Sequence, residues 1–337
     1  MKIKAAKLLS CFSALLIIIS SCNDNNPSSP YEEILGSEPF TAISDSIKKE
    51  PGNDELWFRR AVLLNTNNYP EPALADFQKA WSIKKEEKYA LGISTLLLDK
   101  KPDSAIHFLS EALKILPNSF LLKLSLARGY AATHKTDDAL RVCDAILEQN
   151  PQQVDVLTLK ADLLDKKGNS DGATTILETA YRITPFNVEL NYILALRYAE
   201  AKNPKVLSLC DSLIRADETG SHAEPYYYKG IYYYNINDKA KALALFDEAV
   251  KHDYYFLDGY IEKGSILYEM KKYKEALSVF NLALTISPKF ADAYYWIAKC
   301  QEATGNKEEA KTNYLRAYEL DKSIIEAKQA AEKIINQ

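Results

Sequence analysis

Small and bulky apolar residues recur along most of this chain at an interval of 34 residues. The pattern is clearest between residues 223 and 290, where successive segments align as Gly230 with Gly264, Ala242 with Ala276, Phe246 with Phe280, and Ala249 with Ala283. An interval of this length is typical of stacked helix-turn-helix units. We therefore predict an array of paired helices.

About eight copies of the pattern can be followed between residues 54 and 323. Two copies are irregular. In the second, Gly92 lies one residue early, which predicts a longer turn before the next helix. In the fifth, Asn203 and Pro204 are expected to shorten the turn between the helices, and residues 217–222 to lengthen the exit from the repeat.

These positions resemble the signature of the tetratricopeptide repeat family, in which Trp, Leu, Gly, Tyr, Ala, Phe, Ala and Pro occupy fixed places in two antiparallel helices. The resemblance implies an all-α fold, a right-handed α-solenoid of about eight helix-turn-helix repeats over residues 54–323. Residues 39–53 are predicted to form a leading helix. Residues 324–337 are predicted to form a capping helix with one apolar and one polar face, because the ends of such an array need polar-faced caps.

The N-terminus has the pattern of a secretory signal. Lys2, Lys4 and Lys7 precede an apolar run over residues 8–19, which is too short to span a bilayer. The run ends in Ile-Ser-Ser-Cys22, which resembles the lipobox of bacterial lipoproteins.

We therefore predict a signal peptide over residues 1–21 and a lipidated N-terminal Cys22. The alternative is an ordinary signal peptide that is cleaved nearby, with Cys22 as a bystander. Residues 22–38 are polar and rich in Pro, Ser and Asn, so we expect a flexible tether. The expected location is the cell envelope, with a lipid anchor in the outer membrane of a Gram-negative bacterium.

Composition and charge narrow the possible functions. The formal net charge is −4 and no basic cluster occurs, which argues against nucleic-acid binding. Cys143, Cys210 and Cys300 fall on positions where the repeat favours small or apolar residues, so we expect buried thiols and no disulfide framework.

No catalytic or metal-binding motif is apparent. The four histidines have no zinc-ligand spacing, and Walker, G-x-G-x-x-G and G-x-S-x-G motifs are absent. Two S-x-x-K matches, at Ser46 and Ser82, lack the companion motifs of acyl-serine enzymes. We expect no enzyme activity, no cofactor and no metal site.

In the resembled family, the first helix of each repeat lines a concave surface with its second, fifth, ninth and twelfth positions. Second positions here are mostly acidic: Glu55, Asp155, Glu189, Glu224, Asp258 and Asp292, with Leu121 as the exception. Fifth and twelfth positions supply aromatic rings: Tyr192, Tyr227, Tyr234, Tyr268 and Tyr295. By the same register, Tyr226 and Tyr233 are predicted to be packing residues.

This surface is our predicted binding groove for a protein or peptide, preferably one with basic residues near its middle. Two alternatives remain open. Acidic residues at second positions also stabilise helix N-termini, and tyrosines at these positions are ordinary in the family. The family's Lys/Asn clamp for a C-terminal carboxylate is not matched, because Phe58 and Val62 occupy those positions in the first repeat.

We therefore predict a lipid-anchored, non-catalytic scaffold or adaptor that binds a protein partner of unknown identity. The second hypothesis is a surface lipoprotein that binds a glycan or another nutrient. Glycan-binding relatives of this kind build their sites from long insertions between repeats, and this chain has only the short one at residues 217–222.

Overall fold

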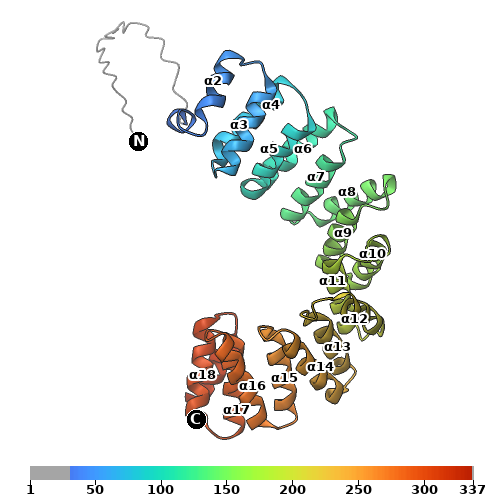
Figure 1. Ribbon diagram of the computed structural model, residues 1–337, viewed down its shortest axis with the longest axis vertical. Coiled ribbons are helices and arrows are strands. Elements are labelled where there is room, and N and C mark those ends of the chain that lie inside the picture. The colour runs from blue at the N-terminus through green and yellow to red at the C-terminus, as the bar shows by residue number, and fades with distance from the viewer. Residues whose placement is uncertain (1–30, 336–337) are drawn as a thin grey trace, which may run out of the picture. The chain divides into compact units, whose positions relative to one another are not determined.

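The computed structural model describes residues 31–335, and this part of the chain forms 19 α-helices and no β-strand (Figure 1). The prediction of an all-α helical-repeat fold is confirmed. The predicted signal peptide 1–21 and the predicted lipidation residue Cys22 lie outside the described residues.

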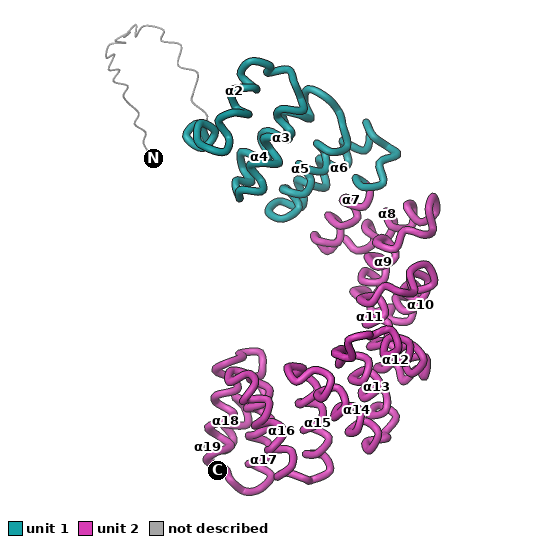
Figure 2. Tube along the Cα trace, viewed as in Figure 1, with its two compact units in different colours: residues 1–122 teal, residues 123–337 magenta. Residues whose placement is uncertain are grey.

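The chain divides into two compact units, residues 1–122 and residues 123–337, and the boundary falls inside helix α7 (Phe120–Ala132) (Figure 2). The helices of the first unit before α7 are α1 (Glu32–Leu35), α2 (Thr41–Lys49), α3 (Asp54–Thr66), α4 (Pro70–Ile83), α5 (Glu87–Lys100) and α6 (Pro102–Ile115). The second unit contains α8 (Thr136–Gln149), α9 (Val154–Lys166), α10 (Ser170–Ile183), α11 (Val188–Glu200), α12 (Lys205–Ala216), α13 (Glu224–Asn235), α14 (Lys239–His252), α15 (Leu257–Glu269), α16 (Tyr273–Ile286), α17 (Ala291–Ala303), α18 (Lys307–Leu320) and α19 (Ile325–Ile335).

Neighbouring helices in the chain form the pairs that the 34-residue interval predicts. Within the second unit, α13 packs on α14, α15 on α16, and α17 on α18. The second helix of a pair also packs on the first helix of the next pair, as α14 does on α15. Each pair therefore buries its apolar face against its neighbours, as expected for a repeat array.

The helices approach closely where a glycine faces a phenylalanine. A Cβ added at Gly264 in α15 would lie 2.3 Å from Cε1 of Phe280 in α16, and one added at Gly230 in α13 would lie 2.6 Å from Cε1 of Phe246 in α14. Both rings are fully buried. The hydrogen side chain of glycine is what allows these rings to lie against the partner helix.

The turns inside the pairs also repeat. In every such turn except the one between α5 and α6, one residue adopts a left-handed backbone conformation: Asn68, His134, Gly168, Lys202, Asn237, Lys271 and Gly305. The residue after it donates its N–H to the carbonyl five residues earlier, for example from Lys272 to Leu267. This bond satisfies a carbonyl at the end of the first helix, and is the usual way to end a helix with a left-handed residue.

The irregular copies depart from the regular repeat in different ways. The prediction of a longer turn in the second repeat is wrong, because only Lys101 separates α5 from α6. Helix α5 has 14 residues and α15 has 13, but three residues follow α15 before the next helix, so no residue is inserted in the second repeat. Gly92 is not equivalent to Gly264, because it faces Phe77 of the preceding pair, whereas Gly264 faces Phe280 of its own pair.

In the fifth repeat the prediction of a shorter turn is wrong, because four residues, 201–204, separate α11 from α12, whereas three separate α15 from α16. The shortening lies in the second helix of the repeat: buried Val206 follows buried Tyr198 by eight positions, whereas Ala276 follows Leu267 by nine. Helix α12 has 12 residues, two fewer than α16. The exit segment, residues 217–223, is lengthened as predicted.

The predicted tether, residues 22–38, extends too far into the folded part. Residues 32–35 form α1, and Ile34 and Leu35 pack against a core cluster that includes Phe40 and Leu64. These two apolar side chains supply the buried surface that the polar composition of the segment concealed.

Helix α2 occupies the predicted leading segment, residues 39–53, and is tied to the first pair by a buried polar network. Arg60 donates from Nε and Nη2 to the two carboxylate oxygens of Asp76, at 2.6 and 2.8 Å, and from Nη1 to Ser44 Oγ at 3.1 Å. The three residues lie on α3, α4 and α2, and each is at most 6% exposed. A buried, two-bond pair of this kind fixes the geometry of its helices.

At the other end, α19 lies in the segment predicted as the capping helix, residues 324–337. Ala327, Ala331 and Ile334 are buried against Tyr314 and Ala317 of α18. Its exposed residues include Glu326, Lys328, Glu332 and Lys333, so the outer side of this helix is polar.

The contact between Gly264 and Phe280 predicts that replacing this helical glycine by alanine destabilises the protein, although alanine usually stabilises a helix. Gly264→Ala should raise helix propensity by about 1 kcal/mol, yet the added methyl group would overlap a ring that is stacked on Trp296. Overpacking costs about 1–3 kcal/mol, so we expect a net loss of stability in denaturant unfolding. Adding Phe280→Leu should remove part of that loss. Gly52→Ala, where no atom lies within 4 Å, is the control; equal midpoints for the two alanine variants would contradict the contact.

Candidate partner-binding face

The candidate face of the second unit is formed by the first helices of its pairs, α9, α11, α13, α15 and α17, and we call it the first-helix face. Five predicted carboxylates lie one per helix at the second position: Asp155, Glu189, Glu224, Asp258 and Asp292. Glu224 is half-buried and the other four are exposed. Within residues 31–335, none of the five forms an ion pair.

Glu55, the predicted member in the first unit, differs from these five. Its carboxylate lies 2.6 Å from Lys88 Nζ and 3.3 Å from Arg59 Nε. Because two cations already neutralise it, Glu55 is a structural residue rather than an available acidic contact.

The acidic residues of the first-helix face repel one another. Burial, together with the nearby charges of Asp258 and Glu269, raises the pKa of Glu262. Burial and the charges of Asp321 and Asp258 raise the pKa of Asp292. The charged forms of these groups are therefore disfavoured in the free protein, and a bound cation would relieve the cost.

One end of the face is hollowed into a cleft of about 300 Å³ between α9 and α11, which Arg128 of α7 also lines. Asp155 and Glu189 both line this cleft, together with Asp162 at the ninth position of α9. Ile193 and Leu159 supply apolar walls. Burial and the charge of Asp165 raise the pKa of Asp162.

The predicted tyrosines are less free than the acidic residues. Tyr227 is half-buried, and its ring lies 5.6 Å from that of Phe246 and 5.2 Å from that of Phe256. Tyr192 makes an edge contact with Tyr228, 5.9 Å between ring centroids. These rings therefore contribute to packing between repeats as well as to the surface.

Tyr234 has a defined polar partner. Its hydroxyl donates to Glu269 Oε1 at 2.7 Å, and Lys239 Nζ lies 2.8 Å from the other oxygen of the same carboxylate. The hydrogen bond to Glu269, together with burial, raises the pKa of Tyr234 to about 12. The ring bridges α13 to α15.

The two remaining tyrosines belong to a group that sequence reasoning did not find. Tyr268 and Tyr295 make edge contacts with Trp296, and Lys299 Nζ lies 5.1, 5.5 and 4.1 Å from the three ring centroids respectively. Burial lowers the pKa of Lys299. The sequence feature that could have indicated this group is Trp296 at the sixth position of α17 followed by Lys299 at the ninth.

The packing assignments were correct for Tyr233 and Tyr226. The Tyr233 ring packs against two core clusters, and the Tyr226 ring stacks on His252 with 4.3 Å between centroids. Sequence reasoning missed Tyr232, which is buried beside Tyr233, and Tyr228.

The remaining candidate chemistry is limited. Cys143, Cys210 and Cys300 are buried as predicted, and burial raises the pKa of their thiols to about 11, 12 and 11. No group of His, Cys, Asp or Glu suited to a metal ion occurs among the described residues. Over the same part of the chain, every helix is too short or too polar to cross a bilayer.

Comparisons with known proteins agree with this geometry. One family model described as tetratricopeptide repeat matches residues 96–163 and 267–317, and a second with the same description matches residues 227–289. A crystal structure of a tetratricopeptide repeat protein from Parabacteroides merdae aligns with 73% of this chain and 97% of that chain, at a TM-score of 0.57 and 18% identity. The chain therefore contains tetratricopeptide repeats over the matched residues.

Curated relatives of this tetratricopeptide-repeat protein include human anaphase-promoting complex subunit 7, which is 24% identical over 293 residues, 83% of this chain and 50% of the relative. Mouse interferon-induced protein with tetratricopeptide repeats 3 is 30% identical over 135 residues, 39% of this chain and 34% of the relative. The chain thus spans at most about half the length of these two relatives.

The repulsion within the face of this tetratricopeptide-repeat protein predicts a pH dependence. A carboxyl group with a raised pKa in the folded state destabilises the fold as pH rises from its ordinary value, near 4.5, through the raised value. Glu262→Gln should therefore increase the free energy of unfolding at pH 7 by about 0.2–0.5 kcal/mol, the usual cost of like charges four residues apart on a helix. The gain should vanish below pH 4.5, as measured by denaturant unfolding.

Glu269→Gln is the matched control with the opposite sign. Burial alone would raise the pKa of Glu269, but Lys239 and Tyr234 outweigh it and the pKa is lowered. This variant should be less stable than the parent protein at pH 7. Equal effects of the two substitutions at pH 7 would show that charge is not what distinguishes them.

Proposed function

We propose that this tetratricopeptide-repeat protein is a membrane-anchored scaffold or adaptor, without catalysis of its own, that binds a protein partner on its first-helix face. The observation that carries the proposal is the row of five second-position carboxylates without ion pairs, beside half-buried tyrosines. The human relative is by its name a subunit of a complex, which agrees with a role in protein assembly.

The charge of the face favours a partner segment with lysine or arginine residues. Consecutive first helices present their carboxylates at equivalent places, so an extended segment with spaced cations can meet several of them in turn. Burial, together with repulsion from neighbouring carboxylates, already disfavours the charged forms of Glu262 and Asp292. A cation on the partner would reverse that repulsion, and complementary charge would also speed association.

The rings of the face add contact area. Tyr234 and Tyr295 are half-buried, and aromatic side chains lose little conformational entropy when they bind. Tyrosine is enriched among the residues that dominate binding energy at protein interfaces. The acidic residues would set orientation, and the rings would supply most of the buried apolar area.

The lipid anchor is a separate part of the proposal and rests on the sequence alone. Lys2, Lys4 and Lys7, the apolar run over residues 8–19 and the Ile-Ser-Ser-Cys22 motif are the features that support it. Two or more acyl chains on Cys22 would hold the folded part at a membrane of the cell envelope, in our proposal the outer membrane.

The binding face can be tested by neutralising two unpaired carboxylates. Asp258→Asn with Asp292→Asn should lower recovery of the cross-linked partner from native cells by roughly tenfold, the effect of about 1.4 kcal/mol. Quantitative mass spectrometry of affinity-purified complexes measures this. Binding by the parent protein should also weaken as salt is raised.

Glu55→Gln with Glu71→Gln is the matched control, because both of these carboxylates are already paired with lysines. Equal recovery from both double variants would place the binding site elsewhere. Binding to an oligosaccharide panel, with no protein recovered, would instead support the glycan-binding alternative.

The anchor can be tested independently. Cys22→Ala should move the protein from the membrane fraction to the soluble envelope fraction and abolish labelling by radioactive palmitate, because no thiol remains to be acylated at that position. Cys11→Ala, within the apolar run, should change neither result. Membrane retention of the Cys22→Ala protein would refute lipidation as the means of attachment.

A further inference from the structure

The same hydrogen bond recurs at one position of the first helices in four repeats of this chain. Side chains at the fourth position donate to the backbone carbonyl six residues earlier: Trp57 to Pro51 at 3.0 Å, Tyr260 to Tyr254 at 3.2 Å, Tyr294 to Pro288 at 3.1 Å, and Asn191 to Pro185 at 2.9 Å. Each of these four donors lies eleven residues before the left-handed residue of its turn. The four positions are therefore structurally equivalent.

The fifth repeat makes this bond without a ring. Asn191 donates from Nδ2, but it has no aromatic body to fill the space that the indole or phenol occupies in the other three repeats. A pocket of about 280 Å³ lies at this place, lined by Tyr181, Val188, Asn191, Leu209 and Leu213. We call it the fifth-repeat pocket.

Asn191, which lines the pocket, also has an unused acceptor. Its side chain is 4% exposed, and its Oδ1 has no hydrogen-bond partner within residues 31–335. The bond from Nδ2 to Pro185 fixes which end of the amide is the oxygen. A buried acceptor without a partner costs about 1–3 kcal/mol, so a donor that reached it would be favoured.

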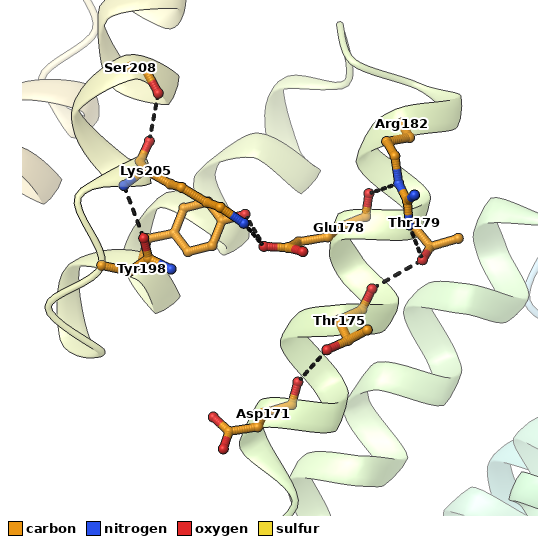
Figure 3. Close-up of polar contacts among 9 residues, drawn as sticks. Asp171, Thr175, Glu178, Thr179, Arg182, Tyr198, Lys205 and Ser208 are labelled. Carbon is orange, nitrogen blue, oxygen red and sulfur yellow. Dashed lines mark hydrogen bonds and ion pairs between the residues drawn. The ribbon is translucent and has the colours of Figure 1, made fainter.

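The polar groups beside the pocket are already satisfied (Figure 3). Tyr198 donates from its hydroxyl to Glu178 at 2.6 Å, and Lys205 Nζ lies 2.7 Å from the same carboxylate. The hydroxyl of Ser208 donates to the Lys205 carbonyl at 3.1 Å. Tyr198, Lys205 and Ser208 of this network line a neighbouring pocket. In the fifth-repeat pocket itself, Ser212 donates to the Ser208 carbonyl at 3.0 Å, and Asn191 Oδ1 is a buried acceptor without a partner.

The rim of the pocket is apolar and open to solvent. Phe186, which also lines the pocket, is 92% exposed, and Val188 is 47% exposed. These two side chains place exposed apolar surface at the mouth of the pocket.

We propose that the fifth-repeat pocket accepts one aromatic side chain that carries an N–H or O–H donor, a tryptophan or a tyrosine, from a protein partner. The pocket lies at the position that the rings of Trp57, Tyr260 and Tyr294 occupy in their own repeats. Its volume suits a single side chain better than a drug-sized ligand. The incoming donor bonds Asn191 Oδ1, and Phe186 packs over the bound ring.

This surface shares no residue with the acidic first-helix face. The pocket is lined from α10, α12 and the start of α11, whereas the carboxylates without ion pairs lie at second positions of the first helices. Failure of the proposed function would therefore leave this inference standing, and the reverse also holds.

The test uses the full-length protein and four peptides, acetyl-Gly-Ser-X-Ser-Gly-amide, with X as Trp, Tyr, Phe or Leu. Titration followed by nuclear magnetic resonance should shift the side-chain amide signal of Asn191 with the Trp and Tyr peptides. We expect these two to bind at least about tenfold more tightly than the Phe peptide, because only they satisfy the buried acceptor. Equal affinities for the Trp and Phe peptides would overturn the proposal.

Asn191→Tyr is the decisive variant, since its ring should fill the pocket and restore the bond that Tyr260 and Tyr294 make. It should fold, melt at a higher temperature than the parent protein, and no longer bind the Trp peptide. Phe186→Ala should weaken binding severalfold, and Tyr255→Ala, a loop aromatic that is 74% exposed, should not. Undiminished binding by Asn191→Tyr would refute the site. Concentration-dependent dimers that Phe186→Ala abolishes would assign the pocket to a second copy.

Discussion

The close approach of neighbouring helices is the constraint on which the rest of this structure depends. Gly230 and Gly264 have no side chain where Phe246 and Phe280 lie against them, so the paired helices meet at distances that no other residue would allow. An isolated helix pair has too little apolar surface to be stable, and each pair is completed by the next. Alanine holds the equivalent position in other pairs, as Ala161 and Ala298 do, and is fully buried there.

The same regularity makes exceptions informative. Seven turns use a left-handed residue at the same place, and three fourth positions use a ring to reach the same carbonyl. Asn191 retains the bond and omits the ring. The result is a pocket beside an unsatisfied acceptor, in a repeat whose second helix is also shortened and whose exit is lengthened.

The carboxylates at equivalent second positions also differ from one repeat to another. Glu55 occupies the second position of its helix but is neutralised by Lys88 and Arg59. Asp258 and Asp292 occupy the same position in their helices and have no ion pair among the described residues. Helix dipoles favour carboxylates at the second position in every repeat, so residue type alone cannot separate the stabilising members from the available ones. Whether a second-position carboxylate is neutralised or available depends on whether an adjacent helix places a lysine or arginine beside it.

The sequence by itself determined the helical class, the number and order of the helix pairs, and the buried cysteines, because a fixed 34-residue interval repeats local rules that hold without knowledge of distant contacts. Only the tertiary structure decided that Ile34 and Leu35 pack on the core and that Tyr227 is partly a packing residue. It also revealed the ring group around Lys299 and the space beside Asn191. These features depend on side chains from different helices, whose approach is set by packing rather than by their order in the chain.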